Sequence, residues 1–215
     1  MRLPLRCRIP EARFEAGFAR VRAELDVPDR FPTAVLDEAA AAAAAGPAVP
    51  AGADAEVRDA TDLMLVAIDP AGSTDLDQAY GARRRGSGYR VHYAIADVAS
   101  LVAPEGAIDT EARRRGVTLY SPDLRTSLHP EAISEQAGSL LAGEIRQALL
   151  WTIDLDSDAE PVAAHMQRAT VRNRQQLSYR AAQQQIPTVD PDHPLALLRE
   201  IGELRLQREI DRDAV

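Results

Sequence analysis

Three aspartates stand close together at the point where an apolar run ends. The segment "LMLVAIDPAGSTDLDQAY" (63–80) leads from six apolar residues into Asp69, Asp75 and Asp77. Residues two apart in an extended segment project to the same side, so Asp75 and Asp77 should share a face. Asp69 can approach them across the turn that contains Gly72. Carboxylates gathered in this way repel one another unless a cation lies between them, and their hard oxygen atoms suit Mg²⁺ or Mn²⁺.

A metal ion held by such carboxylates typically positions a water and stabilises charge during displacement at phosphorus. Two other interpretations fit the same residues. One is a solvated acidic loop, and the other is the DxD metal site of a nucleotide-sugar glycosyltransferase. An EF-hand calcium loop that starts at Asp75 is excluded, because its sixth position would be Tyr80 where glycine is needed.

The composition excludes several other classes of site. The chain has 215 residues and a formal net charge of −8, and all 25 of its basic residues are arginine. The absence of lysine excludes a Walker-type nucleotide site and any catalytic lysine. A single cysteine, Cys7, cannot form an internal disulfide or a thiolate metal cluster. No segment resembles a signal peptide or reaches the roughly 18 apolar residues of a membrane span, so we expect a cytoplasmic protein.

Alternating strand and helix patterns must position the aspartates. Strands are expected at 63–68, 89–102 and 148–156, and helices at 109–116 and 194–215. The polar turn "RRRGSG" precedes the second strand and indicates a hairpin. Together these elements predict an α+β fold with a mixed β-sheet flanked by helices.

The first 55 residues differ in pattern from the rest. Residues 11–26 place four apolar side chains at helical spacing, which predicts an amphipathic helix packed on something larger; these are Phe14, Phe18, Val21 and Leu25. A short helix should follow Pro32 and fade through polyalanine to Gly46. We therefore expect an N-terminal helical segment and Ala/Pro-rich linker over 1–55, and the main domain over 56–215.

The acidic segment resembles the first active-site motif of the ribonuclease II (RNB) family of 3′→5′ exoribonucleases. That motif has an aspartate, five residues, an aspartate, one residue and two further aspartates. Here the four positions are Asp69, Asp75, Asp77 and Gln78, so a glutamine replaces the last carboxylate. The sequence resembles a branch of the family that writes this motif "DLDQA".

Further blocks follow in the order of the family: "YAIADVASLV" (93–102), "IDTEARRRGVTLYSPD" (108–123) and "SLHPEAISEQAGSLLAGEIRQAL" (127–149). The resemblance implies the N-terminal part of an RNB-type catalytic domain that is truncated at the C-terminus. The remaining catalytic groups should then lie beyond Val215. We therefore expect residues 1–215 alone to be weakly active or inactive, with sheet strands left unpaired.

The resemblance also implies an activity and a set of site residues. The activity is hydrolytic release of nucleoside 5′-monophosphates from the 3′ end of single-stranded RNA, with Mg²⁺ or Mn²⁺ as cofactor. The metal ligands would be Asp69, Asp75, Asp77 and Gln78, with Asp77 indispensable. The RNA-binding residues would be Tyr120, Tyr179, Arg146, Arg115, Arg172 and Arg174. No membrane and no obligate protein partner is expected.

Alternatives remain at this point. Each tyrosine can instead be a half-buried core residue with a satisfied hydroxyl group. Arginines on exposed turns, such as 83–85, need no ligand, although local basic patches can follow a phosphate backbone even on an acidic protein. The four histidines show no spacing that suits zinc or a nucleophilic triad. A non-catalytic RNA-binding relative is the alternative to an enzyme.

Overall fold

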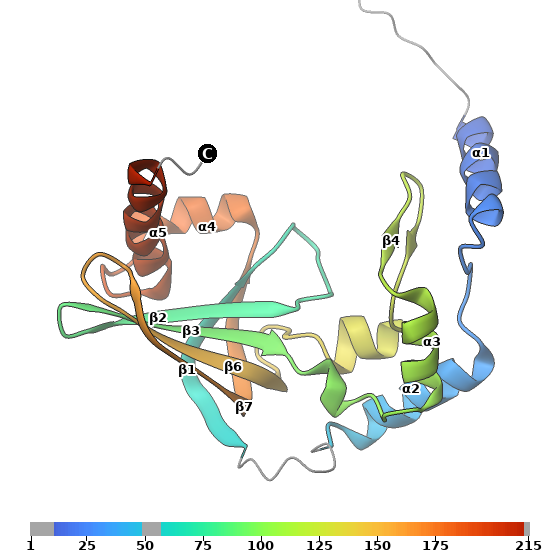
Figure 1. The fold of residues 1–215 in the computed structure, drawn as a ribbon, viewed down its shortest axis with the longest axis horizontal. Coiled ribbons are helices and arrows are strands. Elements are labelled where there is room, and N and C mark those ends of the chain that lie inside the picture. Colours follow the sequence, from blue (N-terminus) through green and yellow to red (C-terminus); the bar gives the residue numbers. More distant parts are fainter. Residues whose placement is uncertain (1–10, 49–56, 213–215) are drawn as a thin grey trace, which may run out of the picture.

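Five strands form a closed barrel of mixed direction. In a computed structural model, which describes residues 11–48 and 57–212, the neighbours around the barrel are β1 (Arg58–Ile68), β2 (Gln78–Arg85), β3 (Gly88–Ala96), β6 (Ile145–Leu155) and β7 (Pro161–Leu177). The pair β1–β7 is parallel, and the other neighbouring pairs are antiparallel. Helices pack against this barrel (Figure 1). The α+β class with a mixed sheet is therefore confirmed.

The strands of the barrel differ from expectation in three respects. In the described part of the chain the sheet closes into a barrel, because β1 pairs with β7 from Arg58–Ala169 to Ile68–Leu177, although β1 and β2 pair directly only at Val66–Tyr80. The long strand β7 was not expected at all. The expected strand over 89–102 ends early, since β3 stops at Ala96 and the short helix η1 (Val98–Ser100) follows.

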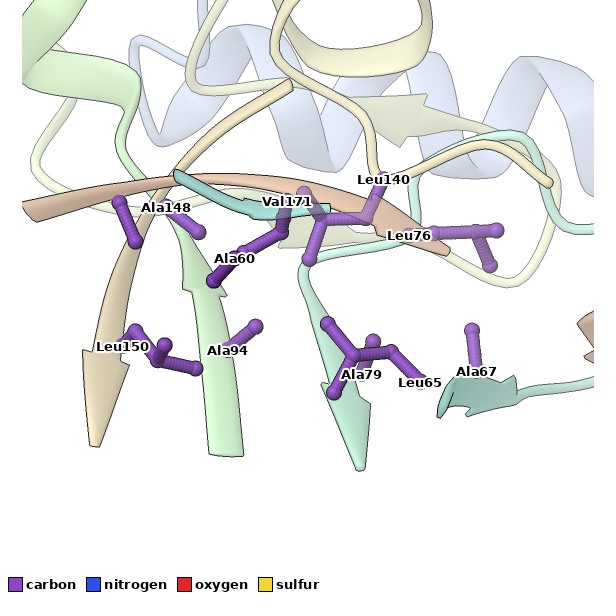
Figure 2. Close-up of a cluster of buried hydrophobic side chains, with 11 residues drawn as sticks. Ala60, Leu65, Ala67, Leu76, Ala79, Ala94, Leu140, Ala148, Leu150 and Val171 are labelled. Carbon is purple, nitrogen blue, oxygen red and sulfur yellow. The ribbon is translucent and has the colours of Figure 1, made fainter. Parts of the chain in front are cut away.

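Small side chains fill much of the barrel interior. Its central cluster contains six buried alanines among larger residues: Ala60, Ala67, Ala79, Ala94, Ala148 and Ala169, with Leu65, Leu76, Leu140, Leu150 and Val171 (Figure 2). Five strands enclose little space, so small and large side chains must share it. This interior fixes which residues of each strand face outward.

Two helices cover the outside of the barrel. Helix α5 (Pro194–Asp211) buries Leu197 and Ile201 against the outer faces of β2, β3 and β6. Leu195 of the same helix packs with Val66 of β1 and with α4 (Tyr179–Gln185), which follows β7 and is joined to α5 through η3 (Ile186–Thr188). The end of β7 and the end of β1 are thereby held together.

A separate helical cluster packs beside the barrel. Helix α2 (Thr33–Ala45) buries Val35 and Ala39 against α3 (Ala107–Arg115) and the π-helical segment η2 (Ala132–Ala137). Glu38 of α2 also accepts a hydrogen bond of 2.6 Å from the backbone N–H of Ala107, at the start of α3. The short helix expected between Pro32 and Gly46 is therefore confirmed, and it packs against other helices because alanine suits close helix contacts. The expected boundary near residue 55 lies outside the described residues.

The first helix has less contact with the rest of the chain than expected. Helix α1 (Glu11–Glu24) leads away from the other helices (Figure 1), and Val21 and Leu25 are exposed. The side chain of Phe14 and the whole of Cys7 lie outside the described residues. Arg22 pairs with Asp123 at 2.6 Å, which links α1 to the small hairpin of β4 (Leu119–Tyr120) and β5 (Arg125–Thr126). None of the described helices is long and apolar enough to span a membrane.

Candidate active site

The loop between β1 and β2 is fixed by backbone hydrogen bonds on both sides. At its start the N–H of Asp69 donates to the carbonyl of Leu177 at 3.0 Å, which joins the ends of β1 and β7. At its end the carbonyl of Asp77 accepts from the N–H of Ala96 at 2.8 Å. The three aspartates are therefore attached to the barrel wall rather than to a free loop.

Leu76 explains why its two neighbours face outward. Its side chain is buried in the barrel core, and its backbone N–H and carbonyl bond to Ser139 Oγ at 2.9 Å and to the N–H of Leu140 at 2.9 Å. Residues on either side of a buried one in an extended segment project to the opposite face. Burial of Leu76 thus places Asp75 and Asp77 together on the outer side, as their spacing predicts.

Asp75 and Asp77 lie in one pocket with Tyr120. The pocket has a volume of about 170 Å³, and its wall also includes Arg125 of β5 and His129. The aspartates come from the loop before β2, whereas Tyr120 comes from the β4–β5 hairpin. Two separate segments of the chain therefore converge on one opening.

Arg125 holds these segments together. Its guanidinium group donates to Asp75 Oδ2 at 2.6 Å and also to a carboxylate oxygen of Glu135 in η2. Glu135 in turn accepts from the hydroxyl of Thr74 at 2.6 Å. Two carboxylates and one guanidinium group thus connect the acidic loop, the hairpin and η2. A π-helical segment is uncommon and occurs often at functional sites.

Asp77 has a perturbed acidity. Partial burial raises its pKa above the usual value for aspartate, and the nearby negative charges of Asp75 and then Asp69 raise it further. The raised pKa shows that the three carboxylates interact electrostatically even though Asp69 does not line the pocket. Arg125 pairs with Asp75 and leaves Asp77 without an ion-pair partner among the described residues.

Comparison with known proteins identifies the type of domain. A model of the family described as "RNB domain" matches residues 57–214. That match covers well over half of the chain. The chain belongs to the RNB domain family. Membership removes the basis for the glycosyltransferase alternative.

Individual relatives support this assignment. Over 129 residues the chain is 39% identical to DIS3-like exonuclease 2 of Arabidopsis thaliana, covering 59% of this chain and 12% of that protein. The same figures apply to a protein of the same organism called inactive exonuclease DIS3L2. A structure of Mycoplasma genitalium RNase R in complex with ribose methylated single-stranded RNA has a TM-score of 0.78 and 22% identity. That match covers 91% of this chain and 31% of the RNase R chain.

The donor set of this RNB domain fits a divalent cation in its chemistry. Nucleases of the family are metal-dependent, and aspartate oxygens are the ligands that Mg²⁺ prefers. Burial raises the pKa of Asp77 most, and repulsion by Asp75 and Asp69 raises it further; a bound cation would relieve that repulsion. Among residues 11–48 and 57–212, however, no group of three or more His, Cys, Asp or Glu is arranged to hold a metal ion. Binding of a metal by Asp75, Asp77, Asp69 and Gln78 therefore stays a prediction.

Both predicted tyrosines are on the surface. Tyr120 is 76% exposed and Tyr179, the first residue of α4, is 64% exposed, so neither is a half-buried core residue. Tyr120 lines the pocket of Asp75 and Asp77, whereas Tyr179 does not. Tyr179 comes two residues after Leu177, the end of β7, whose carbonyl accepts from the N–H of Asp69. Their contact with RNA stays a prediction.

The four predicted RNA-binding arginines differ in exposure and in the contacts they make. The side chain of Arg115 is only 3% exposed; it pairs with Glu111, lies 3.8 Å from the ring centroid of Phe31 and donates to two backbone carbonyls. Arg146 donates to the carbonyls of Ser139 and Gln136 and so braces the turn after η2. Both side chains therefore make structural contacts within the domain, and their contact with RNA stays a prediction.

Arg172 lies between the buried residues Val171 and Asn173 of β7, and Arg174 follows Asn173, so both arginines face outward. Arg174 donates to the carbonyl of Thr61 in β1. Neither lines the pocket of Asp75 and Asp77. A role for these two arginines would therefore be to bind RNA away from the reacting end, and it stays a prediction.

Sequence reasoning missed Arg125, Glu135 and His129. His129 lies in the pocket wall with Nδ1 buried and without a partner in the described structure, and burial lowers its pKa. The position of Arg125 five residues after Tyr120, across the short turn "SPDL", was the available signal. It indicates a hairpin that returns an arginine to the side of the tyrosine.

Proposed function

We propose that the protein is a 3′→5′ hydrolytic exoribonuclease that acts on single-stranded RNA and releases nucleoside 5′-monophosphates. The observation that carries this proposal is the pocket in which Asp75 and Asp77 lie beside the exposed ring of Tyr120. Membership of the RNB domain family supports it. Because the chain spans only 12% to 31% of the relatives described above, activity of the whole protein is part of the proposal.

Each pocket residue has a distinct task in this proposal. Asp75 and Asp77, with Asp69 and Gln78 beside them, would hold Mg²⁺ or Mn²⁺, which when bound supplies a water of lowered pKa and stabilises charge on phosphoryl oxygens. Tyr120 offers a flat face on which the terminal base can stack. Arg125 holds the hairpin of Tyr120 against the acidic loop. Hydrolysis breaks the bond between phosphorus and the 3′ oxygen, leaving a 3′-hydroxyl on the shortened RNA.

The geometry of the tyrosine supports a single-stranded substrate. A base can stack on Tyr120 only when it is released from pairing, because the ring is on the surface of a hairpin and not at a duplex-shaped groove. The neighbouring carboxylates repel the phosphate backbone unless a cation is bound. Metal and single-stranded RNA should therefore bind cooperatively.

Three features of the site favour a second candidate, an RNA-binding domain without nuclease activity. Arg125 already neutralises Asp75, Gln78 stands where the family motif has an aspartate, and no metal-ready group of three is present among the described residues. A relative of equal similarity is called an inactive exonuclease. Such a protein would bind RNA at Tyr120 without cleaving it.

Digestion of 3′-labelled single-stranded RNA separates these candidates. The chain and the full-length gene product that contains it are each incubated with RNA in Mg²⁺ or in EDTA, and binding is measured in parallel. Mg²⁺-dependent release of nucleoside 5′-monophosphates supports the exonuclease. Binding of RNA without release by the full-length product would establish the second candidate.

The Asp158→Asn variant is a matched control. Asp158 is exposed in the turn between β6 and β7, far from the acidic loop in the fold. Its substitution removes one carboxylate and leaves the pocket unchanged. Activity should therefore be retained by this variant.

A further inference from the structure

The barrel has a second pocket at the seam between β1 and β2. These strands pair directly only at Val66 and Tyr80, and the register of β1 on β7 shifts between Ala60 and Leu65. The strands therefore separate toward the start of β1. The resulting opening, which we call the seam pocket, has a volume of about 490 Å³ and is lined by Arg58, Asp62, Leu63, Met64, Gly81, Ala82, Arg83, Arg90 and His92.

Gly81 makes the seam pocket possible. A Cβ atom at this position would lie 2.7 Å from the carbonyl oxygen of Met64, which is closer than real contacts allow. Only glycine lets β1 and β2 approach this closely at Met64. From there toward Arg58, at the start of β1, the two strands separate. The seam pocket is thus a built feature of the barrel wall and is not a gap left by a mobile loop.

Three guanidinium groups converge on the seam pocket. Arg58 comes from β1, Arg83 from β2 and Arg90 from β3, where it pairs with Arg83 in the strand register. Arg90 is bound to the carboxylate of Asp154 at 2.6 Å and 2.8 Å. Arg58 and Arg83 form no ion pair within the described part of the chain. Unpaired guanidinium groups that share a pocket repel one another, and a bound anion would relieve that repulsion.

His92 supplies a hydrogen-bond donor that carries no charge. It is 5% exposed and lies opposite Gly81 in the register of β3 on β2. Burial, followed by the charges of Arg58, Arg83 and Arg90, lowers its pKa to about 4, so the ring is neutral at pH 7; Asp62 acts in the opposite direction. Its Nδ1 lies 3.3 Å from the hydroxyl of Thr152. With Nδ1 accepting from that hydroxyl, the proton of the neutral ring is assigned to Nε2, which remains available to a ligand.

We propose that the seam pocket is an anion-binding site that takes a phosphate group, held by Arg58 and Arg83 with His92 as a neutral donor. Guanidinium groups bind phosphate oxygens through paired hydrogen bonds, and the pocket is large enough for a nucleotide phosphate with part of its sugar. Asp62 at the same pocket limits the affinity and disfavours a more highly charged ligand.

The seam pocket is distinct from the acidic pocket. It lies toward the start of β1 and the end of β2, whereas the aspartates lie at the opposite ends of both strands. From Gln78 to Arg83 is five residues along β2, or roughly 17 Å at about 3.3 Å per residue. The phosphate could belong to a free nucleotide or to an RNA backbone that passes along the outside of the barrel, and both present the same chemistry.

The nuclear magnetic resonance signals of the His92 ring test this proposal on the 215-residue chain. Inorganic phosphate is titrated at pH 7 and constant ionic strength, in EDTA and with chloride as the balancing anion. We expect a saturable shift of the His92 signals, and a rise of its pKa by about one unit because a negative charge arrives nearby. Absence of a saturable shift at His92 with every phosphate probe would overturn the proposal.

Variants locate the ligand. The double variant Arg58→Gln/Arg83→Gln should bind phosphate at least about tenfold more weakly, as loss of charged hydrogen bonds implies. Asp62→Asn should bind it more tightly, which a misfolded protein could not do. Arg199→Gln, on the exposed side of α5, is the matched control and should leave the affinity unchanged. Equal affinity of the double variant and the wild type would place the anion elsewhere and refute the site.

Two further probes distinguish the source of the phosphate. Adenosine 5′-monophosphate and a five-nucleotide single-stranded RNA are titrated under the same conditions. A stronger His92 response to the nucleotide assigns the pocket to free nucleotides, and a stronger response to the oligonucleotide assigns it to the RNA backbone. Either response supports the site only if the double variant weakens it.

Discussion

The two ends of the β1–β2 strand pair carry clusters of opposite charge: carboxylates at one end and guanidinium groups at the other. At one end Asp69, Asp75 and Asp77 repel one another, and Arg125 compensates only part of that charge. At the other end Arg58 and Arg83 share a pocket without an ion-pair partner among the described residues. The first arrangement favours a cation and the second an anion, although both belong to the same two strands.

This contrast shows why net charge describes the molecule poorly. A formal charge of −8 predicts weak attraction for any phosphate. Over distances larger than the Debye length of about 8 Å, however, exposed charges are largely screened, so each pocket responds mainly to its own neighbours. A chain that is acidic overall can therefore bind RNA through local groups and can have a separate site for a phosphate.

The largest expected effect comes from removing the charge of Asp77 in the acidic pocket. Asp77→Asn in the full-length gene product should lower the rate of RNA cleavage by about 100-fold or more, because charge stabilisation in the transition state is commonly worth that much. Affinity for RNA should stay within a few fold, since a metal ligand acts mainly on the reacting phosphate. Single-turnover cleavage and binding measurements check the two quantities separately. Near wild-type cleavage by Asp77→Asn would show that the acidic pocket is not the reaction centre.

Gln78→Asp sharpens the same test. The change restores the aspartate of the common family motif, so cleavage should be retained and the concentration of Mg²⁺ needed for half-maximal rate should fall. Gln78 is exposed at the start of β2, and the change should leave the melting temperature nearly unchanged. A loss of cleavage would show that the amide has a role of its own.

The next effect is the pH dependence of stability that His92, in the seam pocket, should cause. The pKa of His92 is lowered to about 4 in the folded protein, whereas an unfolded histidine has a pKa near 6.5. Between these values the unfolded chain binds the proton and the folded chain does not. The free energy of unfolding should therefore fall as pH falls below 6.5, by about 2 kcal/mol at pH 5 and about 3 kcal/mol at pH 4, since each pKa unit is worth about 1.4 kcal/mol.

Urea unfolding at pH 7.5 and pH 5 measures this loss. His92→Gln should remove most of the difference in free energy between the two pH values, whatever its effect at pH 7.5. The exposed His165 offers a matched control, because His165→Gln should leave the difference unchanged. An undiminished difference in His92→Gln would assign the pH dependence to other groups.

A third effect tests whether the acidic end holds a base. Tyr120→Ala should weaken binding of short single-stranded RNA by about 1 to 3 kcal/mol, the usual value of one stacking platform. Because Tyr120 is largely exposed, the melting temperature should change little. Fluorescence anisotropy and thermal unfolding measure the two responses. Tyr179→Ala makes the matching change outside the pocket, and a larger loss for Tyr179 than for Tyr120 would move the main platform to α4.

The sequence was sufficient to predict the acidic pocket but not the seam pocket. The spacing of Asp75 and Asp77 and the resemblance around Tyr120 were sufficient to bring these residues together in advance. Strand β7 was missed because its inward positions are small or polar, such as Ala169 and Asn173, while arginines alternate with them. That pattern resembles a basic surface segment more than a strand of a barrel.

Contacts between distant residues account for the rest. Arg125 and Asp75 are 50 positions apart, and their pairing depends on how the hairpin returns over the loop. The seam pocket draws its arginines from three strands and depends on Gly81, whose need for close approach is visible only in the fold. The packing of α2 was hidden for a similar reason, because polyalanine has no distinct apolar face.

The smallest expected effect concerns Arg125, the one cation that the described structure already places at the acidic pocket. Its guanidinium group competes with any metal ion for Asp75, so Arg125→Gln should increase affinity for Mn²⁺. Arg125 is about one-third exposed, and exposed ion pairs are worth about 0 to 1 kcal/mol, which limits the gain to about fivefold. Loss of the bridge from Arg125 to Asp75 and Glu135 should also weaken RNA binding slightly, because the hairpin of Tyr120 would be held less firmly.

Calorimetric titration with Mn²⁺ measures this change, with Arg113→Gln as a control on the exposed side of α3. Arg125→Lys keeps the charge but cannot bridge Asp75 and Glu135 with one planar group, so its affinity should fall between wild type and Arg125→Gln. An Arg125→Gln variant that binds Mn²⁺ more weakly than wild type would mean that Arg125 orders the aspartates for the metal. Arg125 would then help to form the metal site of the acidic pocket, as Arg58 and Arg83 are proposed to form the phosphate site of the seam pocket.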